Sequence, residues 1–339
     1  MTVKILITSY LEPELVRCIR EVDGDFAVIY EPSLIPKPCY FSDHKGEFFT
    51  RSPEEEAQWQ ELLSVADIIF DFDQTHLDDL PDLAPNVKWL QATSSGVARF
   101  MSDRGYKARM PNTIFTNAAG VHAQPLAEFC LMVMIMFNKG FLEVLEDQKK
   151  KHWERYAGID LSNRTLAIIG LGQVGQEIAR IGKQFGMKTI GVKRSIEGAN
   201  LEKLHVDELY APDDLHKVLP KAEYLVLIAP HTDETAKMIA EKEFSLMPKG
   251  SVLINIGRGA LVDEKALIKA LETGHLAGAG LDVFEVEPLP KDSPFWDMPN
   301  VIVSPHSAST TNNENKLITD IFCNNLVRYL AGEDLINLV

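Results

Sequence analysis

The chain has 339 residues, of which 45% are hydrophobic and 24% are charged, and both fractions are ordinary for a globular protein. This composition argues against disorder or a fibre, and the length is typical of two domains that each bury a core. With 34 Lys and Arg against 49 Asp and Glu, the formal net charge is −15, which argues against a nucleic-acid-binding protein with a basic surface.

The N-terminus is predicted to form a first strand over residues 3–7, because it lacks the longer apolar core and the cleavage site of a signal peptide. The longest apolar stretch, residues 129–137, is about half as long as a membrane-spanning helix. Four cysteines are scattered without a Cys-x-x-Cys spacing, which favours buried reduced thiols over a metal site or disulfides. We therefore expect a cytoplasmic protein with no metal, no nucleic acid and no membrane as partner.

Short β-branched runs alternate with helical patterns along the chain, which is typical of α/β folds with parallel sheets. In the first third, strands are predicted at residues 3–7, 26–30, 67–70, 87–92 and 114–116. A helix is predicted at residues 58–65, and residues 32–53, rich in Pro and aromatic side chains, are predicted to form a long loop. A long helix follows at residues 126–150, with a break near Gly140.

A second series of strands predicts a complete doubly wound unit of six strands with intervening helices. These strands lie at residues 165–169, 189–192, 224–228, 252–256, 278–283 and 301–304. The last helical segment, residues 313–330, has no strand after it, so we expect it to return to the first domain.

A glycine-rich string follows the strand at residues 165–169 and opens the next helix. It consists of Gly170-Leu171-Gly172-Gln173-Val174-Gly175, which is the G-x-G-x-x-G fingerprint of a dinucleotide-binding loop in its expected context. Gly170 permits the tight turn, Gly172 lets the backbone approach the pyrophosphate, and Gly175 allows the helix to pack closely on the strand. The N-terminus of that helix offers free N–H groups and a partial positive charge to the pyrophosphate.

The end of the next strand bears on the choice between NAD and NADP. An NAD site places an Asp or Glu there to accept from the ribose 2′-OH, but the strand ends in Lys193, Arg194 and Ser195. Two cations and a hydroxyl suit a 2′-phosphate, so we expect NADP, with NAD as the alternative cofactor and a solvated basic turn as the alternative interpretation.

Polar residues after three later strands are the candidate catalytic groups, because ligands of open α/β sheets bind beyond the carboxyl ends of the strands. Arg258 stands between two glycines, His306 follows the last strand, and the carboxylates Glu285 and Glu287 follow the strand between them.

Several separated motifs together resemble the D-isomer-specific 2-hydroxyacid dehydrogenase family, in that family's order. Besides the glycine string they are Asn255-Ile256-Gly257-Arg258-Gly259, Gly278-Ala279-Gly280-Leu281-Asp282-Val283-Phe284, Glu287-Pro288 and Ser304-Pro305-His306-Ser307-Ala308. The N-terminal resemblance is thinner and rests on Ser94-Ser95-Gly96-Val97 and Asn117-Ala118-Ala119-Gly120.

The resemblance implies that Arg258, Glu287 and His306 are the catalytic residues. Hydride addition to a 2-keto acid builds negative charge on the carbonyl oxygen, and histidine, which titrates near neutrality, can supply the proton. The Glu-Pro motif selects Glu287 over Glu285 as the carboxylate that orients the imidazole. Arg258 would bind the substrate carboxylate and polarise the carbonyl.

Further contacts are implied by the same resemblance. Backbone N–H groups of Ser95, Gly96 and Val97 would bind the substrate carboxylate, and Arg258 and His306 are the other expected substrate contacts. Pro230, His231, Ile256 and Asp282 are expected at the cofactor, together with the glycine loop and the Lys193, Arg194 and Ser195 turn. His122, Gln124 and Arg99 are candidates for substrate contact, and Ala98 stands where the family commonly has an Asp.

The implied fold is α/β, with two Rossmann-like, doubly wound parallel-sheet domains, one flavodoxin-like and one dinucleotide-binding, and a cleft between them. Residues 1–117 with 311–339 would form the substrate domain, and residues 118–310 the inserted dinucleotide-binding domain. The expected function is reduction of a small anionic 2-keto acid such as glyoxylate or hydroxypyruvate by NADPH, in a homodimer. The alternatives are an NAD-dependent D-2-hydroxyacid dehydrogenase of phosphoglycerate or lactate type, and a cofactor-sensing corepressor-like binding protein.

Overall fold

The computed structural model describes residues 2–339, and the chain forms two compact units. The terminal unit, Met1–His122 with Thr310–Val339, is built from both ends of the chain, and the central unit is Ala123–Ser309. The chain therefore passes from one unit to the other twice. Each unit holds one parallel sheet with helices on both faces, which confirms the predicted fold class.

The terminal unit has a five-stranded sheet in the order β2-β1-β3-β4-β5, in which every neighbouring pair is parallel. All five predicted strands are present, and each lies within two residues of its expected limits at both ends. They are β1 (Val3–Ile7), β2 (Phe26–Ile29), β3 (Ile68–Phe70), β4 (Trp89–Gln91) and β5 (Ile114–Thr116).

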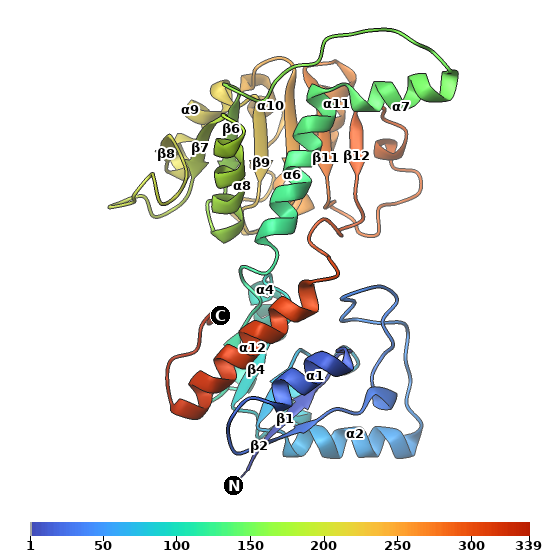
Figure 1. The fold of residues 1–339 in the computed structure, drawn as a ribbon, viewed down its shortest axis with the longest axis vertical. Coiled ribbons are helices and arrows are strands. Elements are labelled where there is room, and N and C mark those ends of the chain that lie inside the picture. The colour runs from blue at the N-terminus through green and yellow to red at the C-terminus, as the bar shows by residue number, and fades with distance from the viewer. Residues whose placement is uncertain (1) are drawn as a thin grey trace. The chain divides into compact units, whose positions relative to one another are not determined.

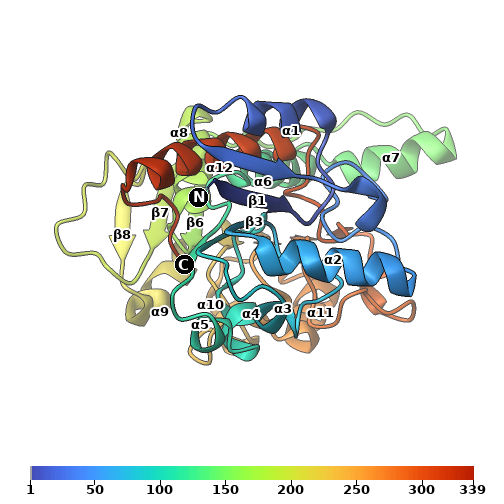
Figure 2. The ribbon, with the colours of Figure 1, turned by 90° about the horizontal axis from the view of Figure 1, so that it is seen from below.

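Alternation along these strands divides the core of the terminal unit into two halves. Ile5 and Ile7 of β1 pack toward α1 (Pro13–Arg20) and α12 (Glu314–Ala331), which lie side by side, whereas Leu6 packs toward the opposite face (Figure 2). The elements on that opposite side are η1 (Pro32–Leu34), α2 (Pro53–Val65), α3 (Leu80–Leu83), α4 (Ala98–Asp103) and α5 (Tyr106–Arg109).

Helix α2 begins earlier than the sequence predicted. It starts at Pro53, where the Ser52 hydroxyl accepts from the Glu55 N–H and the Glu55 carboxylate accepts from the Ser52 N–H. Such a capping box satisfies two backbone donors of the first turn, and a proline fits the first helical position. The expected start at residue 58 is therefore wrong, since apolar periodicity alone misses a polar first turn.

The central unit has a seven-stranded parallel sheet in the order β12-β11-β10-β9-β6-β7-β8. The prediction of six strands is wrong by one, because the half-buried edge strand β8 is only three residues long and shows no periodicity. The strands are β6 (Thr165–Ile169), β7 (Lys188–Val192), β8 (Glu208–Tyr210), β9 (Tyr224–Leu227), β10 (Ser251–Asn255), β11 (Leu276–Leu281) and β12 (Val301–Val303).

Helices cover both faces of this sheet (Figure 1). Leu166 and Ile168 of β6 pack with α6 (Ala123–Asn138) and α8 (Gln173–Gln184), whereas Ala167 and Ile169 pack on the other face. The elements of that face and of the connecting loops are η2 (Pro212–Asp214), α9 (Leu215–Val218), η3 (Leu219–Lys221), α10 (Glu241–Leu246), η4 (Gly259–Leu261), α11 (Glu264–Glu272) and η5 (Pro294–Trp296).

Helix α7 (Phe141–Lys150) departs from this layered arrangement. It follows the break at Gly140, has no buried residue and extends away from the sheet, as Figure 1 shows. The break confirms the interruption predicted within residues 126–150, because Gly140 adopts a left-handed conformation with φ +57° that ends α6.

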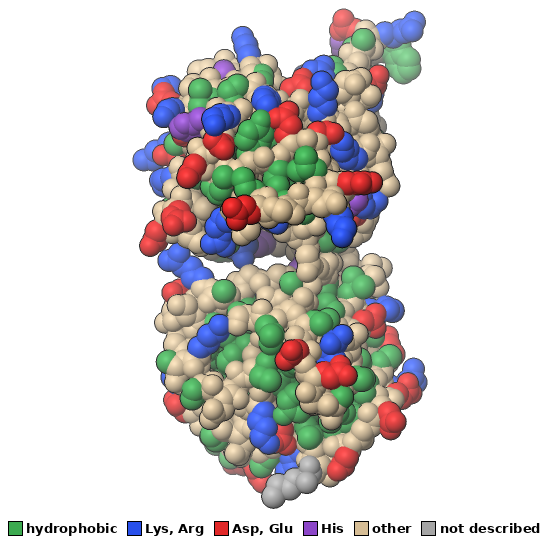
Figure 3. Space-filling model, turned by 90° about the vertical axis from the view of Figure 1, so that its left-hand side faces the viewer, with side chains coloured by type: hydrophobic (Ala, Val, Ile, Leu, Met, Phe, Trp, Pro, Cys, Tyr) green, Lys and Arg blue, Asp and Glu red, His purple; other side chains and the backbone are tan. Residues whose placement is uncertain are grey.

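The surface carries charges of both signs. On the face shown in Figure 3, acidic and basic side chains are interspersed with hydrophobic ones instead of forming one large patch of a single sign. Among the helices of residues 2–339, none combines the length and the apolar character that crossing a membrane requires.

Candidate active site

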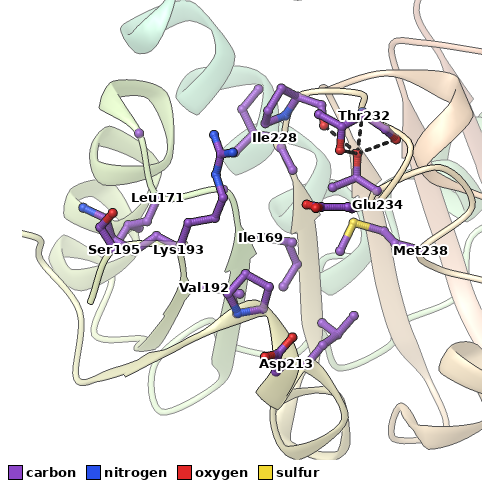
Figure 4. A pocket seen from close by; sticks show the side chains of 18 of the residues that line it. Ile169, Leu171, Val192, Lys193, Ser195, Asp213, Ile228, Thr232, Glu234 and Met238 are labelled. Atoms are coloured by element: carbon purple, nitrogen blue, oxygen red, sulfur yellow. Dashed lines mark hydrogen bonds between the residues drawn. The ribbon is translucent and has the colours of Figure 1, made fainter. Parts of the chain in front are cut away.

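Most of the predicted cofactor residues gather at the carboxyl ends of β6, β7 and β9. Residues after these strands line a cavity of about 1010 Å³, walled on its apolar side by Ile169, Val192 and Ile228 (Figure 4). The predicted residues in its lining are Gly170, Leu171, Gly172, Gln173, Lys193, Arg194, Ser195 and Pro230.

The three glycines of the loop differ in their surroundings. Gly170 has φ +107°, and a Cβ there would lie 2.7 Å from the backbone of Ile228. A Cβ on Gly175 would lie 2.3 Å from the carbonyl oxygen of Gly170, so α8 packs directly against the loop. Gly172, the N-cap of α8, has open space where its Cβ would be. A pyrophosphate can therefore approach the backbone at Gly172 and the N-terminus of α8, and the loop fits a dinucleotide.

One side of this cavity is basic and the other is polar. Figure 4 shows Lys193 and Ser195, from the segment after β7, on one side, and Thr232 and Glu234, from the segment after β9, on the other. The lining residues that sequence reasoning missed include Gln176, Asp213, Thr232, Glu234, Thr235 and Met238. Asp213 follows strand β8, which was not predicted. Gln176 lies in α8, and the other four lie in the segment after β9, so none of these five belongs to the few residues directly after a strand that the sequence singles out.

The three candidate catalytic residues come together in a second, smaller cavity of about 350 Å³. Arg258, Glu287 and His306 line it, together with His231. They follow β10, β11 and β12, whose parallel register places the carboxyl ends of these strands at one edge of the sheet.

The imidazole of His306 is held by Glu287. The Glu287 Oε2 lies 2.7 Å from Nδ1 of His306, and its Oε1 accepts from the Phe284 N–H at 3.0 Å. His306 has φ +53°, and its N–H donates to the Asp282 carbonyl at 2.9 Å. Because the carboxylate accepts at Nδ1, the other ring nitrogen, Nε2, is left to face a bound molecule, and in the protonated ring it can donate a proton to it.

The side chain of Arg258 is exposed, and its backbone is fixed from two sides. The Asn255 Nδ2 donates to the Arg258 carbonyl at 3.0 Å, and the Asn255 Oδ1 accepts from the Gly257 N–H at 3.1 Å. A Cβ on Gly259 would lie 1.9 Å from the carbonyl carbon of Phe284, so only glycine allows this close approach of the two segments. The contact brings Arg258 beside the segment that carries Glu287.

Some predicted cofactor residues lie outside the larger cavity. His231 lines the catalytic cavity, and Ile256 and Asp282 line neither of the two. The buried Asp282 instead holds the segment around His306, because its Oδ1 accepts from the Ser304 hydroxyl at 2.6 Å and from the N–H groups of Ser307 and Ala308. Val174 and Gly175 belong to the first turn of α8 behind the cavity wall.

The predicted substrate loop, residues 95–97, lies in the terminal unit after β4. The Asn117 Nδ2 donates to the Ser95 carbonyl at 3.2 Å, and the Ser95 hydroxyl donates to the Ala118 carbonyl at 3.1 Å. Within residues 2–339 no acceptor faces the N–H groups of Ser95 and Val97. The loop is thus fixed in place while these two donors stay free.

These arrangements limit the chemistry that the central unit can perform. The larger cavity offers a glycine loop and a helix N-terminus, which bind a dinucleotide, and the smaller one offers a guanidinium and a carboxylate-bound imidazole. A guanidinium binds a carboxylate, and an imidazole can protonate an oxygen on which charge develops.

The sequence model of the family described as D-isomer specific 2-hydroxyacid dehydrogenase, NAD binding domain, matches residues 131–308, which is more than half of the chain. The chain belongs to this family. The dehydrogenase is 37% identical to the glyoxylate reductase of Korarchaeum cryptofilum over 231 residues, which cover 66% of this chain and 68% of that protein.

Solved structures agree with this assignment. A D-isomer specific 2-hydroxyacid dehydrogenase family protein from Aeromonas salmonicida matches 100% of this chain and 99% of its own, with a TM-score of 0.81 and 28% identity. The NADPH-dependent glyoxylate/hydroxypyruvate reductase of Sinorhizobium meliloti, crystallised with NADP and sulfate, shares the fold with a TM-score of 0.75 at 23% identity, over 99% of this chain and 98% of that one. The protein is therefore an NAD(P)-dependent oxidoreductase that acts on the CH–OH group of 2-hydroxyacids.

Proposed function

We propose that this dehydrogenase reduces a small 2-keto acid, of the glyoxylate or hydroxypyruvate type, with NADPH as the preferred reductant. The observation that carries the proposal is the joint lining of one cavity by Arg258, Glu287 and His306, with the imidazole bound at Nδ1. Its sequence relatives include several proteins named glyoxylate reductase, which supports a small substrate.

Each of the three residues has one role in the proposed reaction. Arg258 binds the substrate carboxylate and polarises the carbonyl, and Glu287 holds the imidazole so that Nε2 of His306 faces the substrate oxygen. A nicotinamide bound in the larger cavity would supply the hydride to the carbonyl carbon. His306 gives its proton to the carbonyl oxygen, so the products are a 2-hydroxyacid and oxidised cofactor. The terminal unit would act as the substrate domain, with the free N–H groups of Ser95 and Val97 binding the carboxylate.

The preference for NADPH rests on the segment after β7. Lys193, Arg194 and Ser195 line the dinucleotide cavity, and no carboxylate stands at the end of that strand. The two carboxylates in the same lining, Asp213 and Glu234, come from the segments after β8 and β9. A guanidinium and an ammonium beside the ribose would bind the 2′-phosphate of NADPH. NADH has only uncharged hydroxyls at that ribose, so the two cations would have no charged group to bind.

Steady-state kinetics test the reaction and the cofactor together. A panel of 2-keto acids assayed with NADPH and NADH should give turnover with glyoxylate or hydroxypyruvate and a higher kcat/KM with NADPH. His306→Ala should lower kcat by about 10²- to 10⁴-fold while the Kd of NADPH stays unchanged. Undiminished turnover in that variant would refute the role of His306, and a clear preference for NADH would refute the cofactor assignment.

The central unit is also proposed to form a homodimer. Apolar side chains stand exposed on α7 and on the segment after it, where Phe141 is 44%, Trp153 92% and Tyr156 61% exposed. Such a surface is unusual for a monomer and would be covered by a second copy of the chain. Sedimentation velocity should give a dimer for the unsubstituted chain and a monomer for the double variant Phe141→Ser, Trp153→Ser. A monomer before substitution would overturn this proposal.

A further inference from the structure

A line of three hydrogen-bonding side chains reaches the predicted substrate loop from within the terminal unit. The Ser95 Oγ lies 3.3 Å from Nδ1 of His122, and Nε2 of His122 lies 2.9 Å from Oε1 of Glu314. Ser95 follows β4, His122 precedes α6, and Glu314 opens α12. Three segments far apart in the sequence therefore meet at one imidazole.

The two residues of this group that lie away from the substrate loop, His122 and Glu314, are largely buried. The Glu314 side chain is 8% exposed and that of His122 is 14% exposed, and no partner faces the second Glu314 oxygen, Oε2, within residues 2–339. A buried carboxylate is costly unless it is hydrogen-bonded or paired, so its partner His122 matters for the stability of the charged form.

The Glu314 carboxylate determines which imidazole nitrogen faces Ser95 as an acceptor. An ionised carboxylate only accepts hydrogen bonds, so Nε2 of His122 must carry a proton. In the neutral ring Nδ1 is then the acceptor, and the Ser95 hydroxyl lies against it. Glu314 thus fixes the tautomer of His122 without touching the loop itself.

The order Ser-His-Glu also occurs in hydrolytic triads, but this geometry favours holding the serine over activating it. The Ser95 hydroxyl lies 3.1 Å from the Ala118 carbonyl, closer than to the imidazole, and a hydroxyl has a single proton to donate. A serine shared between two acceptors is restrained in one orientation, and the loop backbone is restrained with it.

His122 and Glu314 lie close to the two points at which the chain passes between the units. His122 is the last residue before the chain enters the central unit, and Glu314 lies four residues beyond Thr310, where the chain has returned. The bond between them joins both ends of the terminal unit next to Ser95.

We propose that His122 and Glu314 are positioning residues of the substrate loop. They hold the Ser95 side chain so that the free N–H groups of Ser95 and Val97 are directed at the substrate carboxylate. This inference rests on the proposed function, which assigns the carboxylate to residues 95–97.

The test compares substrate binding with cofactor binding. In His122→Ala and Glu314→Leu, we expect the KM of glyoxylate and the Kd of oxamate, a non-reducible analogue measured by calorimetry with NADPH present, to rise about 10-fold or more. We expect kcat to change by less than about 3-fold. The Kd of NADPH alone should not change, because its cavity belongs to the central unit.

Two further variants separate positioning from a loss of folding. Ser95→Ala removes only the hydroxyl, and its effect on the Kd of oxamate should not add to that of His122→Ala. Glu314→Gln retains an acceptor for Nε2 and should restore most of the affinity that Glu314→Leu loses. Additive effects, or a Glu314→Gln variant as weak as Glu314→Leu, would overturn the inference.

The same unit offers a matched control. Nε2 of His76 lies 2.9 Å from Oε1 of Glu56, and the His76 side chain is 13% exposed. Within residues 2–339, neither residue of this pair forms a hydrogen bond with the substrate loop. His76→Ala should change the melting temperature about as much as His122→Ala and leave the KM of glyoxylate unchanged.

The outcomes distinguish this inference from the proposed function. Oxamate binding and turnover in the unsubstituted chain, with no change in His122→Ala, would refute the positioning role alone. If the unsubstituted chain neither bound oxamate nor reduced any 2-keto acid, the proposed function would fail, and the inference with it.

Discussion

The Glu287 carboxylate and the His306 imidazole form a hydrogen-bonded pair with 2.7 Å between Oε2 and Nδ1. The two residues follow different strands, β11 and β12, and they meet because the Glu287 side chain and the His306 backbone both bind the segment directly after β11, residues 282–284. The Phe284 N–H binds the second oxygen of Glu287, and the Asp282 carbonyl binds the His306 N–H. The imidazole is therefore oriented before any substrate binds, which reduces the reorganisation needed in the reaction.

The first prediction concerns this pair. Glu287→Gln keeps the size of the side chain but replaces the charged acceptor at Nδ1 of His306 by a neutral amide. We expect kcat for the 2-keto acid to fall by about 10²-fold, since general acid catalysis contributes about 10² to 10⁴. Glu285→Gln is the control, because that carboxylate pairs with Lys237 and not with His306. Equal losses in the two variants would contradict the orienting role of Glu287.

The second prediction separates two glycines of the cofactor loop. A Cβ on Gly175 would lie 2.3 Å from the Gly170 carbonyl oxygen, so Gly175→Ala should lower the melting temperature as well as the affinity for NADPH. A Cβ on Gly172 meets no atom within 4 Å, so Gly172→Ala should leave the melting temperature of the free chain unchanged. It should nevertheless weaken NADPH binding, measured by fluorescence titration, because its methyl group would occupy the space of the pyrophosphate. A stable Gly172→Ala chain that binds NADPH normally would argue against this position for the pyrophosphate.

The residues that sequence reasoning brought together correctly are those at strand ends. Arg258, Glu287 and His306 could be predicted as neighbours because each follows a parallel strand, and parallel strands end at one edge of a sheet. This placement depends on the backbone topology and not on side-chain contacts. The glycine loop was recognisable for a similar reason, since its spacing follows from a tight turn between a strand and a helix.

The residues that were missed depend on tertiary contacts instead. The pairing of His122 with Glu314 joins positions 192 residues apart, and no local pattern signals it. Asp213 reaches the cofactor cavity from beyond β8, a three-residue strand formed only by pairing with β7. The start of α2 depends on a capping box, which a search for apolar periodicity overlooks.

The third prediction concerns a buried acid at the end of β3. Asp71 is 2% exposed, and burial raises the pKa of its carboxyl above the ordinary value, although His44 acts in the opposite direction. The folded chain therefore favours the protonated form, and this contribution to stability is present at low pH and is lost as the pH rises through the raised pKa. Asp71→Asn, which cannot ionise, should gain stability relative to the unsubstituted chain between pH 4.5 and pH 7.5.

Urea unfolding followed by tryptophan fluorescence at the two pH values measures this difference. Asp67→Asn is the control, because the pKa of Asp67 is shifted in the opposite direction from that of Asp71. Burial raises the pKa of Asp67, but hydrogen bonds from the Lys4 N–H and the Lys88 ammonium outweigh it and leave the pKa lowered. Both the ordinary pKa of this carboxyl and its lowered value in the folded chain lie below pH 4.5. Asp67→Asn should therefore be less stable than the unsubstituted chain by the same amount at both pH values. If the urea midpoints of Asp71→Asn and the unsubstituted chain differed by the same amount at both pH values, the prediction would be contradicted.

The last prediction concerns the cofactor. Arg194 and Lys193 line the cavity at the end of β7, where a 2′-phosphate would lie beside the ribose. Hydrogen bonds to a charged group contribute about 1.5–3 kcal/mol, so Arg194→Gln should lower kcat/KM for NADPH roughly 10- to 100-fold. It should leave kcat/KM for NADH nearly unchanged, because NADH has no phosphate at that position.

Lys188→Ala provides the matched control, since this exposed lysine starts the same strand at its opposite end. Lys188→Ala should leave kcat/KM unchanged for both NADPH and NADH. This would show that the effect of Arg194→Gln is local and does not come from the change in the net charge of −15. Equal losses with both cofactors in Arg194→Gln would indicate a structural role for the guanidinium. The anionic cofactor is then bound by local cations in an acidic protein, because charges more than about 8–10 Å away are largely screened at physiological salt.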